Sequence, residues 1–478
     1  MDQKGAFNPS RCEILSAELV PFGKSVGDKE NPNISTMIGA FNISQSINNS
    51  ALSGSITVFD GIGLLEGLPL RGEETLHLEI KSYDLQTEVE LICQVYKIDD
   101  VDIKKDQLSL AYTMHWVTKT SYEASKRSFI KGYMRKTAST IVKEIFQKYY
   151  HNDSPLLPYS ESSAAKKSYP EGTLKFNLGN DKGRKLFIEE TTELMQVHIP
   201  DMSPAQAIQF IARRTFGKQP NAGSSFRFFE TYKGYYFVSD EWLYDYGKRN
   251  GVYVFQHGAF LSLDAEDVGE QITSLSTFGN PIRVDVGAEM QAGAYYNTVV
   301  EVDILKRTAK RYNYNYKDFL KQFSDSTGNK ADIKNDIHTE KFIDATFTPE
   351  NARQYMIIRD YKDDASSKDF RVETNFRNLA AQRTFYKMHA AATAVGAITE
   401  GRLDVSAGDI IRVNTDTKNI SADKKDNPVL SGRFLVTGVS NNVENGILKT
   451  SMTMFKYDWS DAGEDDGSRS SNDVEVAV

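Results

Sequence analysis

The sequence predicts a mostly β protein with α+β inserts, and three observations support this fold class. The chain has 478 residues, which exceeds one ordinary domain and predicts several. Aromatic residues make up 11% of it, with 24 Tyr and 26 Phe, and such residues suit pleated, half-buried surfaces. Strict alternation of apolar and polar residues recurs near both ends of the chain.

Residues 1–120 show this alternation most clearly. Leu76, Leu78 and Ile80 fall on one face of an expected strand, and the polar residues between them fall on the other. The same pattern returns twice before residue 117, with Asp-Gly, Arg-Gly and Asp-Asp turns between the runs. Short strands separated by turns are typical of a barrel or sandwich, so this segment is predicted as a first β domain.

Residues 121–265 change character and predict an α/β domain. Apolar residues at helical spacing end before residue 150, and a long exposed loop is expected at 151–185. Ser203 and Gln206 form a capping box that predicts the start of a second helix. Two apolar strands joined by Lys233-Gly234 then predict a hairpin.

The second half of the chain returns to β character. Residues 266–304 and 389–460 are predicted to form a second β domain, which ends in a strand at Ile447–Lys456. Residues 305–388 are largely polar and are interpreted as a second segment of the α/β domain or as an insertion. Residues 461–478 are acidic and rich in Gly and Ser, which predicts a tail. The similarity between the amino-acid sequences of the two β domains is too weak to establish that they are duplicates.

Charge and composition exclude several classes of protein. Lys and Arg number 57 and Asp and Glu number 65, and the net charge of −8 excludes a generally basic nucleic-acid binder. Cys12 and Cys93 are the only cysteines, which excludes a disulfide scaffold and favours two reduced core thiols. The first ten residues contain no apolar core, and no run approaches the ~20 residues of a membrane span. Synthesis in a cytoplasm, without membrane insertion by this chain, is therefore expected.

No catalytic signature emerges from the residues. No His has a second His at metal-ligand spacing, and His77 and His115 lie on polar strand faces, where a hydrogen-bonded His is ordinary. The run Gly179–Lys185 lacks the spacing of a phosphate loop and is interpreted as a charged surface loop. A non-enzymatic binding or structural protein is predicted, with no catalytic, cofactor-binding or metal residues.

Two stretches carry a family resemblance. Residues 53–80 run from a strand through paired leucines and Leu-Pro to a Gly-Glu-Glu turn and an alternating strand. Residues 401–439 place a Gly and a Leu before a Gly turn and two strands. Both stretches resemble the baseplate hub proteins of T-even-like contractile-tail bacteriophages, over residues 10–265 and 370–460. The residues that carry the resemblance are Leu64, Leu65, Pro69, Gly72, Glu73, Glu74, Gly401, Leu403, Gly408 and Gly432.

The resemblance implies two tube-like antiparallel β-barrels in each subunit, and a homotrimer that sets six barrels in a ring. Such a ring would adapt a sixfold tail tube to a threefold central spike in the virion baseplate. The implied partners are two further copies of the chain, the central spike protein, the tail tube or tube-initiator protein and other baseplate proteins, with the tape measure protein as a further candidate. DNA would pass through the lumen during ejection without specific binding, which an acidic chain suits.

Two other functions stay open. One is a distal-tail or tube-initiator protein of another contractile injection system. The other, from a different class, is a tail-associated cell-wall-degrading enzyme, although the sequence lacks the compact acidic helix start that a lytic domain normally shows.

Overall fold

The computed structural model confirms a mostly β fold with few helices. Pro69, the run Gly179–Lys185, the tail at 461–478 and most of the expected loop at 151–185 lie outside the residues it describes. The described residues are 11–21, 23–68, 70, 72–82, 88–103, 110–150, 175–177, 186–191, 194–215, 217, 225–243, 253–257, 274–279, 293, 296–303, 307–315, 353–358, 394–415 and 431–456.

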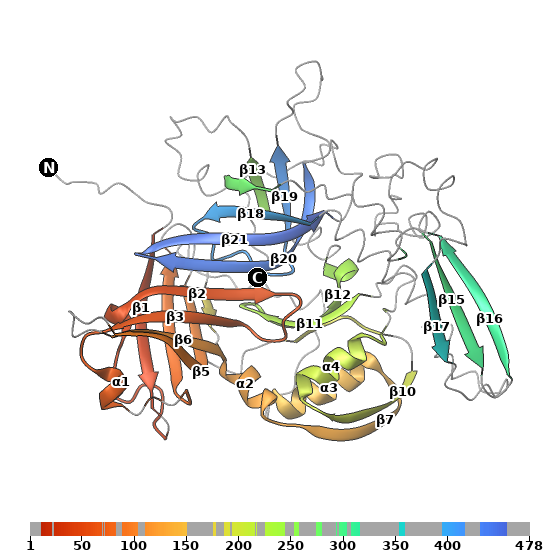
Figure 1. Cartoon of the computed structure of the whole chain (residues 1–478), viewed down its shortest axis with the longest axis horizontal. Helices are drawn as coiled ribbons and strands as arrows, with labels where there is room; N and C mark the ends of the chain where they lie inside the picture. Colours follow the sequence, from red (N-terminus) through yellow and green to blue (C-terminus); the bar gives the residue numbers. More distant parts are fainter. Residues whose placement is uncertain are drawn as a thin grey trace, which may run out of the picture.

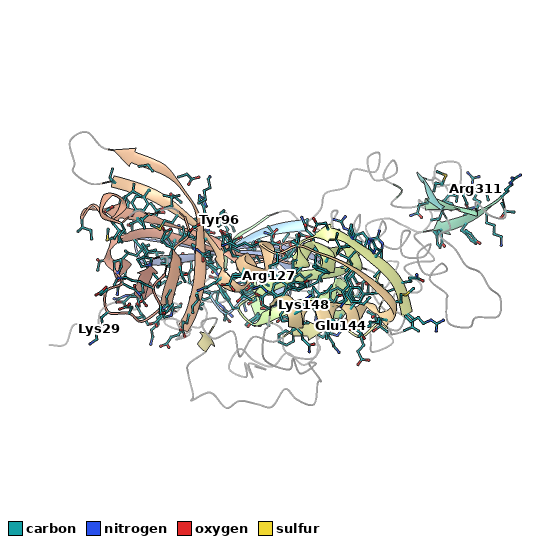
Figure 2. All side chains as sticks on the ribbon, turned by 90° about the horizontal axis from the view of Figure 1, so that it is seen from below. Lys29, Tyr96, Arg127, Glu144, Lys148 and Arg311 are labelled. Atoms are coloured by element: carbon teal, nitrogen blue, oxygen red, sulfur yellow. The ribbon has the colours of Figure 1, made fainter. Side chains whose placement is uncertain are left out.

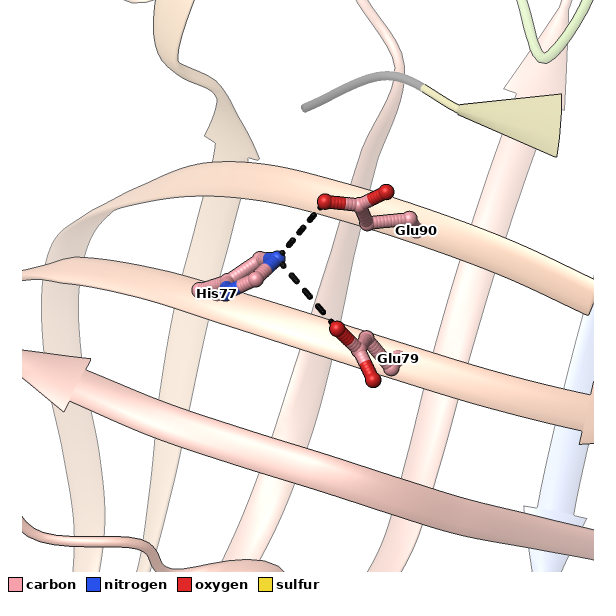
Figure 3. A group of neighbouring side chains, drawn as sticks. All are labelled: His77, Glu79 and Glu90. Carbon is pink, nitrogen blue, oxygen red and sulfur yellow. Dashed lines mark hydrogen bonds and ion pairs between the residues drawn. The ribbon is translucent and has the colours of Figure 1, made fainter. Parts of the chain in front are cut away.

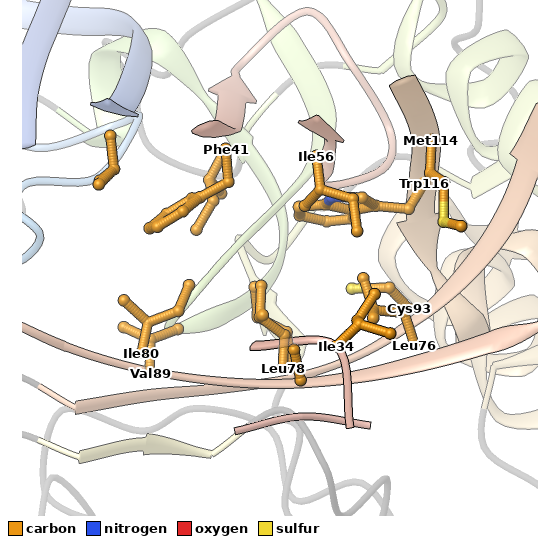
Figure 4. Close-up of a cluster of buried hydrophobic side chains, with 14 of the residues drawn as sticks. Ile34, Phe41, Ile56, Leu76, Leu78, Ile80, Val89, Cys93, Met114 and Trp116 are labelled. Atoms are coloured by element: carbon orange, nitrogen blue, oxygen red, sulfur yellow. The ribbon is translucent and has the colours of Figure 1, made fainter. Parts of the chain in front are cut away.

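Six antiparallel strands form the first repeat, in the sheet order β1-β4-β5-β6-β3-β2. The sheet curls, so that Phe41 and Trp116 face Leu76, Leu78 and Ile80 across a buried core (Figure 4), as the alternation predicts. A short 3-10 turn, η1 (Ser35–Met37), and a short helix, α1 (Leu64–Gly67), connect the strands. The strands are β1 (Cys12–Val20), β2 (Ile38–Ser46), β3 (Ser53–Asp60), β4 (Thr75–Ser82), β5 (Glu88–Ile103) and β6 (Leu110–Thr118).

The α/β region follows and lies to the right of the first repeat in Figure 1. Its second helix begins at the predicted capping box, since Ser203 Oγ accepts from Gln206 N at 3.4 Å and Gln206 Oε1 accepts from Ser203 N at 3.1 Å. The predicted hairpin is also confirmed, as β11 and β12. The elements are α2 (Lys119–Ser125), β7 (Phe129–Thr137), α3 (Ala138–Tyr149), β8 (Lys175–Asn177), β9 (Leu186–Ile188), β10 (Leu194–Met202), α4 (Pro204–Ala212), β11 (Phe226–Thr231) and β12 (Gly234–Ser239).

Six further strands form the second repeat, in the sheet order β13-β19-β20-β21-β18-β14. The final strand has the bounds that the alternation predicts. The strands are β13 (Tyr253–His257), β14 (Leu275–Phe278), β18 (Ala394–Glu400), β19 (Ile410–Thr415), β20 (Gly432–Glu444) and β21 (Ile447–Lys456).

A separate three-stranded sheet stands apart at the right of Figure 1. It contains β15 (Tyr296–Asp303), β16 (Thr308–Asn315) and β17 (Arg353–Ile358), and β15 is the central strand. The sequence assigns β15 to the second β domain and β13 to the α/β domain, whereas β15 pairs outside the second repeat and β13 pairs within it. The domain boundaries as a whole stay a prediction.

The two repeats share one topology. When their strands are numbered along the chain, both sheets have the order 1-4-5-6-3-2. One difference is the direction of the first strand, because β1 runs antiparallel to β4 while β13 runs parallel to β19. The sequence alone leaves duplication open, and the strand order supports it.

The irregularities of the two sheets also coincide. The fifth strand is bulged against the sixth between Val95 and Lys97 in the first repeat, and between Val436 and Gly438 in the second. Val95 N donates to Glu74 O at 2.9 Å, and Val436 N donates to the carbonyl oxygen just before β19 at the same distance. Bulges are specific features rather than defects, so their coincidence indicates equivalent strands.

The second and third strands carry a further matched bulge. The β2–β3 register shifts between Ile38 and Ala40, and the β14–β18 register shifts between Leu275 and Thr277. Phe41 and Phe278 therefore occupy equivalent positions, although β2 and β14 share few identical residues. This equivalence fixes which residues of one repeat correspond to which residues of the other.

Candidate functional site: the joint between the two repeats

The two repeats meet edge to edge at a joint formed by β2 and β20. Antiparallel pairing runs from Ala40 opposite Glu444 to Ser46 opposite Gly438. The strand β20 reaches both neighbours because its first residues pair with β19 and the residues after its bulge pair with β2. The first and second repeats thus form one continuous sheet (Figure 1).

Amide side chains support the joint on both faces of the sheet. On the outer face, Asn42 Nδ2 donates to Ser440 Oγ at 2.7 Å and also to Asn442 Oδ1. On the inner face Asn441 is fully buried, donates to the Tyr232 hydroxyl at 3.2 Å and accepts from Thr450 Oγ1 at 2.9 Å. A buried amide with both ends hydrogen-bonded favours one register over its neighbours.

The hairpin β11–β12 lies against the joint and packs on both repeats. Phe229 and Tyr236 stack at 4.9 Å between ring centroids and share a cluster with Ile47, Leu435 and Phe455. The hairpin turn extends further, because the Tyr232 ring is buried in the core of the first repeat. The α/β region is therefore packed onto the sheet at the point where its two halves meet.

Glu230 links this hairpin to the first repeat. Its side chain is fully buried, and Oε2 accepts from Leu52 N at 3.0 Å, Thr118 Oγ1 at 2.7 Å and Ser121 Oγ at 2.8 Å. The Ser121 hydroxyl also lies 3.1 Å from the Tyr235 hydroxyl. One acidic side chain therefore joins β11, the turn before β3, the end of β6 and helix α2.

Lys233, three residues further on, links the same hairpin to the second repeat. Its Nζ lies 2.7 and 2.9 Å from the two carboxylate oxygens of Asp409. The Asp409 carboxylate also accepts from Ser406 N at 2.8 Å, which holds the turn into β19. Residues 230–233 thus contact both repeats, so the hairpin turn fixes the position of one relative to the other.

Buried hydroxyls near the joint stay protonated. Burial raises the pKa of the Tyr232 hydroxyl well above its ordinary value, although the hydrogen bond from Asn441 opposes this. Burial also raises the pKa of Tyr253, which lies beside the buried pair of Arg402 and Asp404. Arg402 binds Asp404 through two hydrogen bonds of 2.8 and 2.9 Å. The two tyrosine hydroxyls therefore stay protonated near neutral pH and serve as buried structural groups.

The paired leucines of the first resembling stretch belong to a capped turn. Leu64 is buried in the first core, and Leu65 packs against the same core. Asp60 accepts from Ile62 N at 3.1 Å and from Leu65 N at 2.9 Å. Burial opposes ionisation of Asp60, but backbone donors that include Leu64 and Leu65 N–H outweigh it and lower its pKa. The leucines therefore have a packing role, and Asp60 anchors their turn.

The Gly-Glu-Glu turn places its three residues differently. Gly72 N donates to Glu74 Oε2 at 2.9 Å, and Glu74 is buried while Glu73 is exposed. The Glu74 carbonyl accepts from Val95 N and from Gln94 Nε2 at 3.0 Å. This turn starts β4 against β5, which is a structural role.

The second resembling stretch supplies backbone positions around the joint. Leu403 is buried in the first core although it belongs to the second repeat, and Gly401 N donates to Leu448 O at 3.2 Å. Gly408 has a φ of +94°, and a Cβ there would lie 3.2 Å from both Leu243 and Phe229. Gly432 has a φ of +138° and would press on the Lys456 side chain at 2.7 Å. Both glycines permit close packing that a side chain would block.

A cluster of one His and three Glu side chains could not be found from residue spacing in the sequence, because its members come from different strands. His77 Nε2 lies 3.0 Å from Glu90 Oε1 and 3.9 Å from Glu79 Oε1 (Figure 3). His77 Nδ1 lies 3.6 Å from Glu18 Oε2. Glu79 and Glu90 face each other on β4 and β5, so two like charges would oppose without the imidazole between them. His77, Glu79 and Glu90 are close enough to hold one cation. The hydrogen bond between the His77 imidazole and Glu90 explains the arrangement equally well.

Two further sequence expectations concern the cysteines and the membrane. Cys12 and Cys93 are both free and buried in the first core, as predicted. Among the described residues, no helix has the length and apolar character needed to cross a bilayer.

Comparisons with known proteins give structural likenesses only. No protein-family model matches the sequence, and no curated protein matches it. A tail protein from Neisseria meningitidis MC58 superposes with a TM-score of 0.49 at 9% identity, covering 92% of this chain and 96% of that one. A 43 kDa tail protein of prophage MuSo2 from Shewanella oneidensis gives 0.47 at 7% identity, covering 92% and 98%. The c3393 protein of E. coli, a type VI secretion component, gives 0.40 at 8% identity, covering 88% and 73%. All three TM-scores are below 0.5, so these likenesses carry no argument about function.

Proposed function

We propose that the chain is a non-enzymatic structural subunit of a phage tail, and that it forms a trimeric baseplate hub ring. The observation that carries the proposal is the duplicated sheet, in which two repeats of one topology join edge to edge. A chain that contains two equivalent modules suits a ring in which three subunits present six modules. The resemblance of residues 53–80 and 401–439 to hub proteins supports the same assignment.

The described residues around the joint support a structural role. Their buried polar groups are used to hold elements together, as Glu230, Asn441 and Asp409 do. The proposed partners are a central spike on one side of the ring and the tail tube or its initiator on the other, with DNA passing through the lumen. The proposed location is the virion baseplate.

Mass in solution tests the ring. Multi-angle light scattering of the full chain is expected to give three times the chain mass of 53.7 kDa at micromolar concentration. A mass of one chain at every concentration up to about 100 µM contradicts a self-assembling trimer.

The enzyme alternative needs a separate assay. Zymography of the pure protein on bacterial cell walls is expected to show no clearing. Clear lysis would defeat the structural assignment, whatever the oligomeric state.

A further inference from the structure

The joint within the chain predicts a second joint. In the first joint, the second strand of the first repeat, β2, pairs with the fifth strand of the second repeat, β20. The equivalent strands that remain are β14, the second strand of the second repeat, and β5, the fifth strand of the first. Because both repeats have one topology, each contains an equivalent of β2 and an equivalent of β20. Only one of these two strands in each repeat takes part in the joint within the chain.

The matched bulges show which part of β5 corresponds to the joint. Val95 corresponds to Val436, because each lies immediately before the bulge against the sixth strand. The joint segment Gly438–Val443 of β20 then corresponds to Lys97–Ile103 of β5, which contains one additional residue at a second bulge between Asp99 and Asp102. This segment is the candidate receiving edge.

The receiving edge is paired on one side. Its residues pair with β6, whereas the β4 ladder ends at Gln94, and no strand within the described residues lies along the other side. Tyr96 and Val101 are 48% and 47% exposed, which is high for large apolar side chains. Figure 2 shows Tyr96 near the margin of the sheet and the far end of β5 projecting beyond the body. An exposed edge of this length is a template for another strand.

The incoming strand is also paired on one side. Leu275–Phe278 pairs with β18, and Gly279 extends the strand with a hydrogen bond from its N–H to Gly396 O at 2.8 Å. Along the other side, β13 contributes an isolated bridge between Gln256 and Ser274 and a contact of 3.2 Å between His257 Nδ1 and Leu275 O, and both precede Phe278 and Gly279. Leu275–Gly279 carries no charged residue, so it brings no like charge to the aspartates of β5.

We propose that β14 of one copy adds antiparallel to the receiving edge of β5 in a second copy, as β2 adds to β20 within the chain. The equivalent register sets Phe278 opposite Ile103 and Gly279 opposite Asp102. The contact is heterologous, so it propagates from copy to copy until the ring closes and every copy has both of these edges paired. The inference rests on the proposed ring and names the strands that build it.

Cysteine cross-linking tests the contact directly. Val101→Cys replaces an exposed side chain. Gly279→Cys can be accommodated, since a Cβ at this position would lie 3.4 Å from the nearest atom. A mixture of the two single variants is expected to give a covalent dimer with a short bismaleimide, while each variant alone gives none. The double variant is expected to give higher multimers. Gly61 lies in the first repeat, as Val101 does, and has open space around it. As a control, a mixture of Gly279→Cys and Gly61→Cys should give no cross-linked product.

An edge variant separates this contact from the ring itself. Val101→Pro falls within the second bulge, where no cross-strand partner is assigned, so the chain is expected to fold and to weaken assembly at least tenfold. Val101→Thr is the matched control and should assemble normally. This contact is overturned if the wild type is oligomeric but the Val101→Cys and Gly279→Cys pair gives no specific cross-link, or if Val101→Pro assembles like the wild type. The ring would then form through another surface. If the wild type is monomeric and the cysteine pair gives no cross-link, both the contact and the ring are overturned.

Discussion

Removing the Glu230 side chain should uncouple the α/β region from the first repeat. In Glu230→Ala, three buried donors lose their acceptor: Leu52 N–H and the hydroxyls of Thr118 and Ser121. A buried donor without a partner costs about 1–3 kcal/mol. The hydroxyls can rotate, and Ser121 already lies 3.1 Å from the Tyr235 hydroxyl, so they belong at the lower end of that range. The total loss in unfolding free energy is expected to be about 3–5 kcal/mol.

The assay is urea unfolding followed by circular dichroism and by tryptophan fluorescence. Trp116 lies in the core of the first repeat, so in a background that carries Trp242→Phe and Trp459→Phe its fluorescence reports on that repeat. Because Glu230 joins two parts of the molecule, the variant is expected to shift the midpoint and to separate the two signals into distinct transitions. Glu230→Gln keeps one acceptor oxygen and should lose only about 1 kcal/mol.

Helix α2 supplies the matched control. Glu123 is exposed on the helix that also carries Ser121, and Glu123→Ala should change the unfolding free energy by no more than about 0.5 kcal/mol. If Glu230→Ala behaved like Glu123→Ala, the buried hydrogen bonds would not hold the two parts together, and the assignment of Glu230 as their link would be wrong.

Contacts of the joint and its turns give three further predictions. Asp60→Asn should lower the unfolding free energy by about 1 kcal/mol near neutral pH. Because folding lowers the pKa of Asp60, the stability that this carboxylate contributes is present above the ordinary pKa of 3.8 and is lost as pH falls. The unfolding curves of wild type and variant should therefore converge in acid. Gly408→Ala should lose about 1–3 kcal/mol through its positive φ and contact with Phe229, whereas Gly396→Ala, with open space, should be nearly neutral by thermal unfolding. Lys233→Met and Asp409→Asn should show a coupling of about 0.5–1 kcal/mol in a double-mutant cycle, and the coupling should shrink in 1 M salt, because Lys233 is partly exposed; a salt-independent coupling would argue against ion pairing.

The alternation of residues was enough to predict the strands that bury one face. Leu76, Leu78 and Ile80 predict β4, and the final strand β21 has its predicted bounds for the same reason. Strands without an apolar face escaped. β16, with the sequence TAKRYNYN, is largely exposed, with Tyr312 and Tyr314 half-buried, and lies in a segment interpreted as part of the α/β domain or as an insertion. Periodicity detects burial, so a strand that buries little gives no signal.

The joint could not be predicted, because its partners lie 400 residues apart. Asn42 and Asn442 are ordinary strand residues in sequence, and only the shared sheet brings their amides together. The cluster of His77, Glu79 and Glu90 could not be predicted for the same reason, since its members come from two strands. The motif residues that the structure describes lie at core and turn positions, and the link residues Glu230 and Lys233 carried no motif at all.

The matched repeats also show where this fold accepts added chain. In the first repeat the second and third strands are joined by Ile47–Leu52, whereas the equivalent strands of the second repeat are separated by residues 279–393. Closing a flexible loop of that length in place of the short turn costs only about 2–3 kcal/mol, because the entropy of loop closure grows with the logarithm of length. The β18 strand still pairs antiparallel with β14 across this insertion. That turn is where a new surface could be added to, or an old one removed from, a subunit whose sheet stays unchanged.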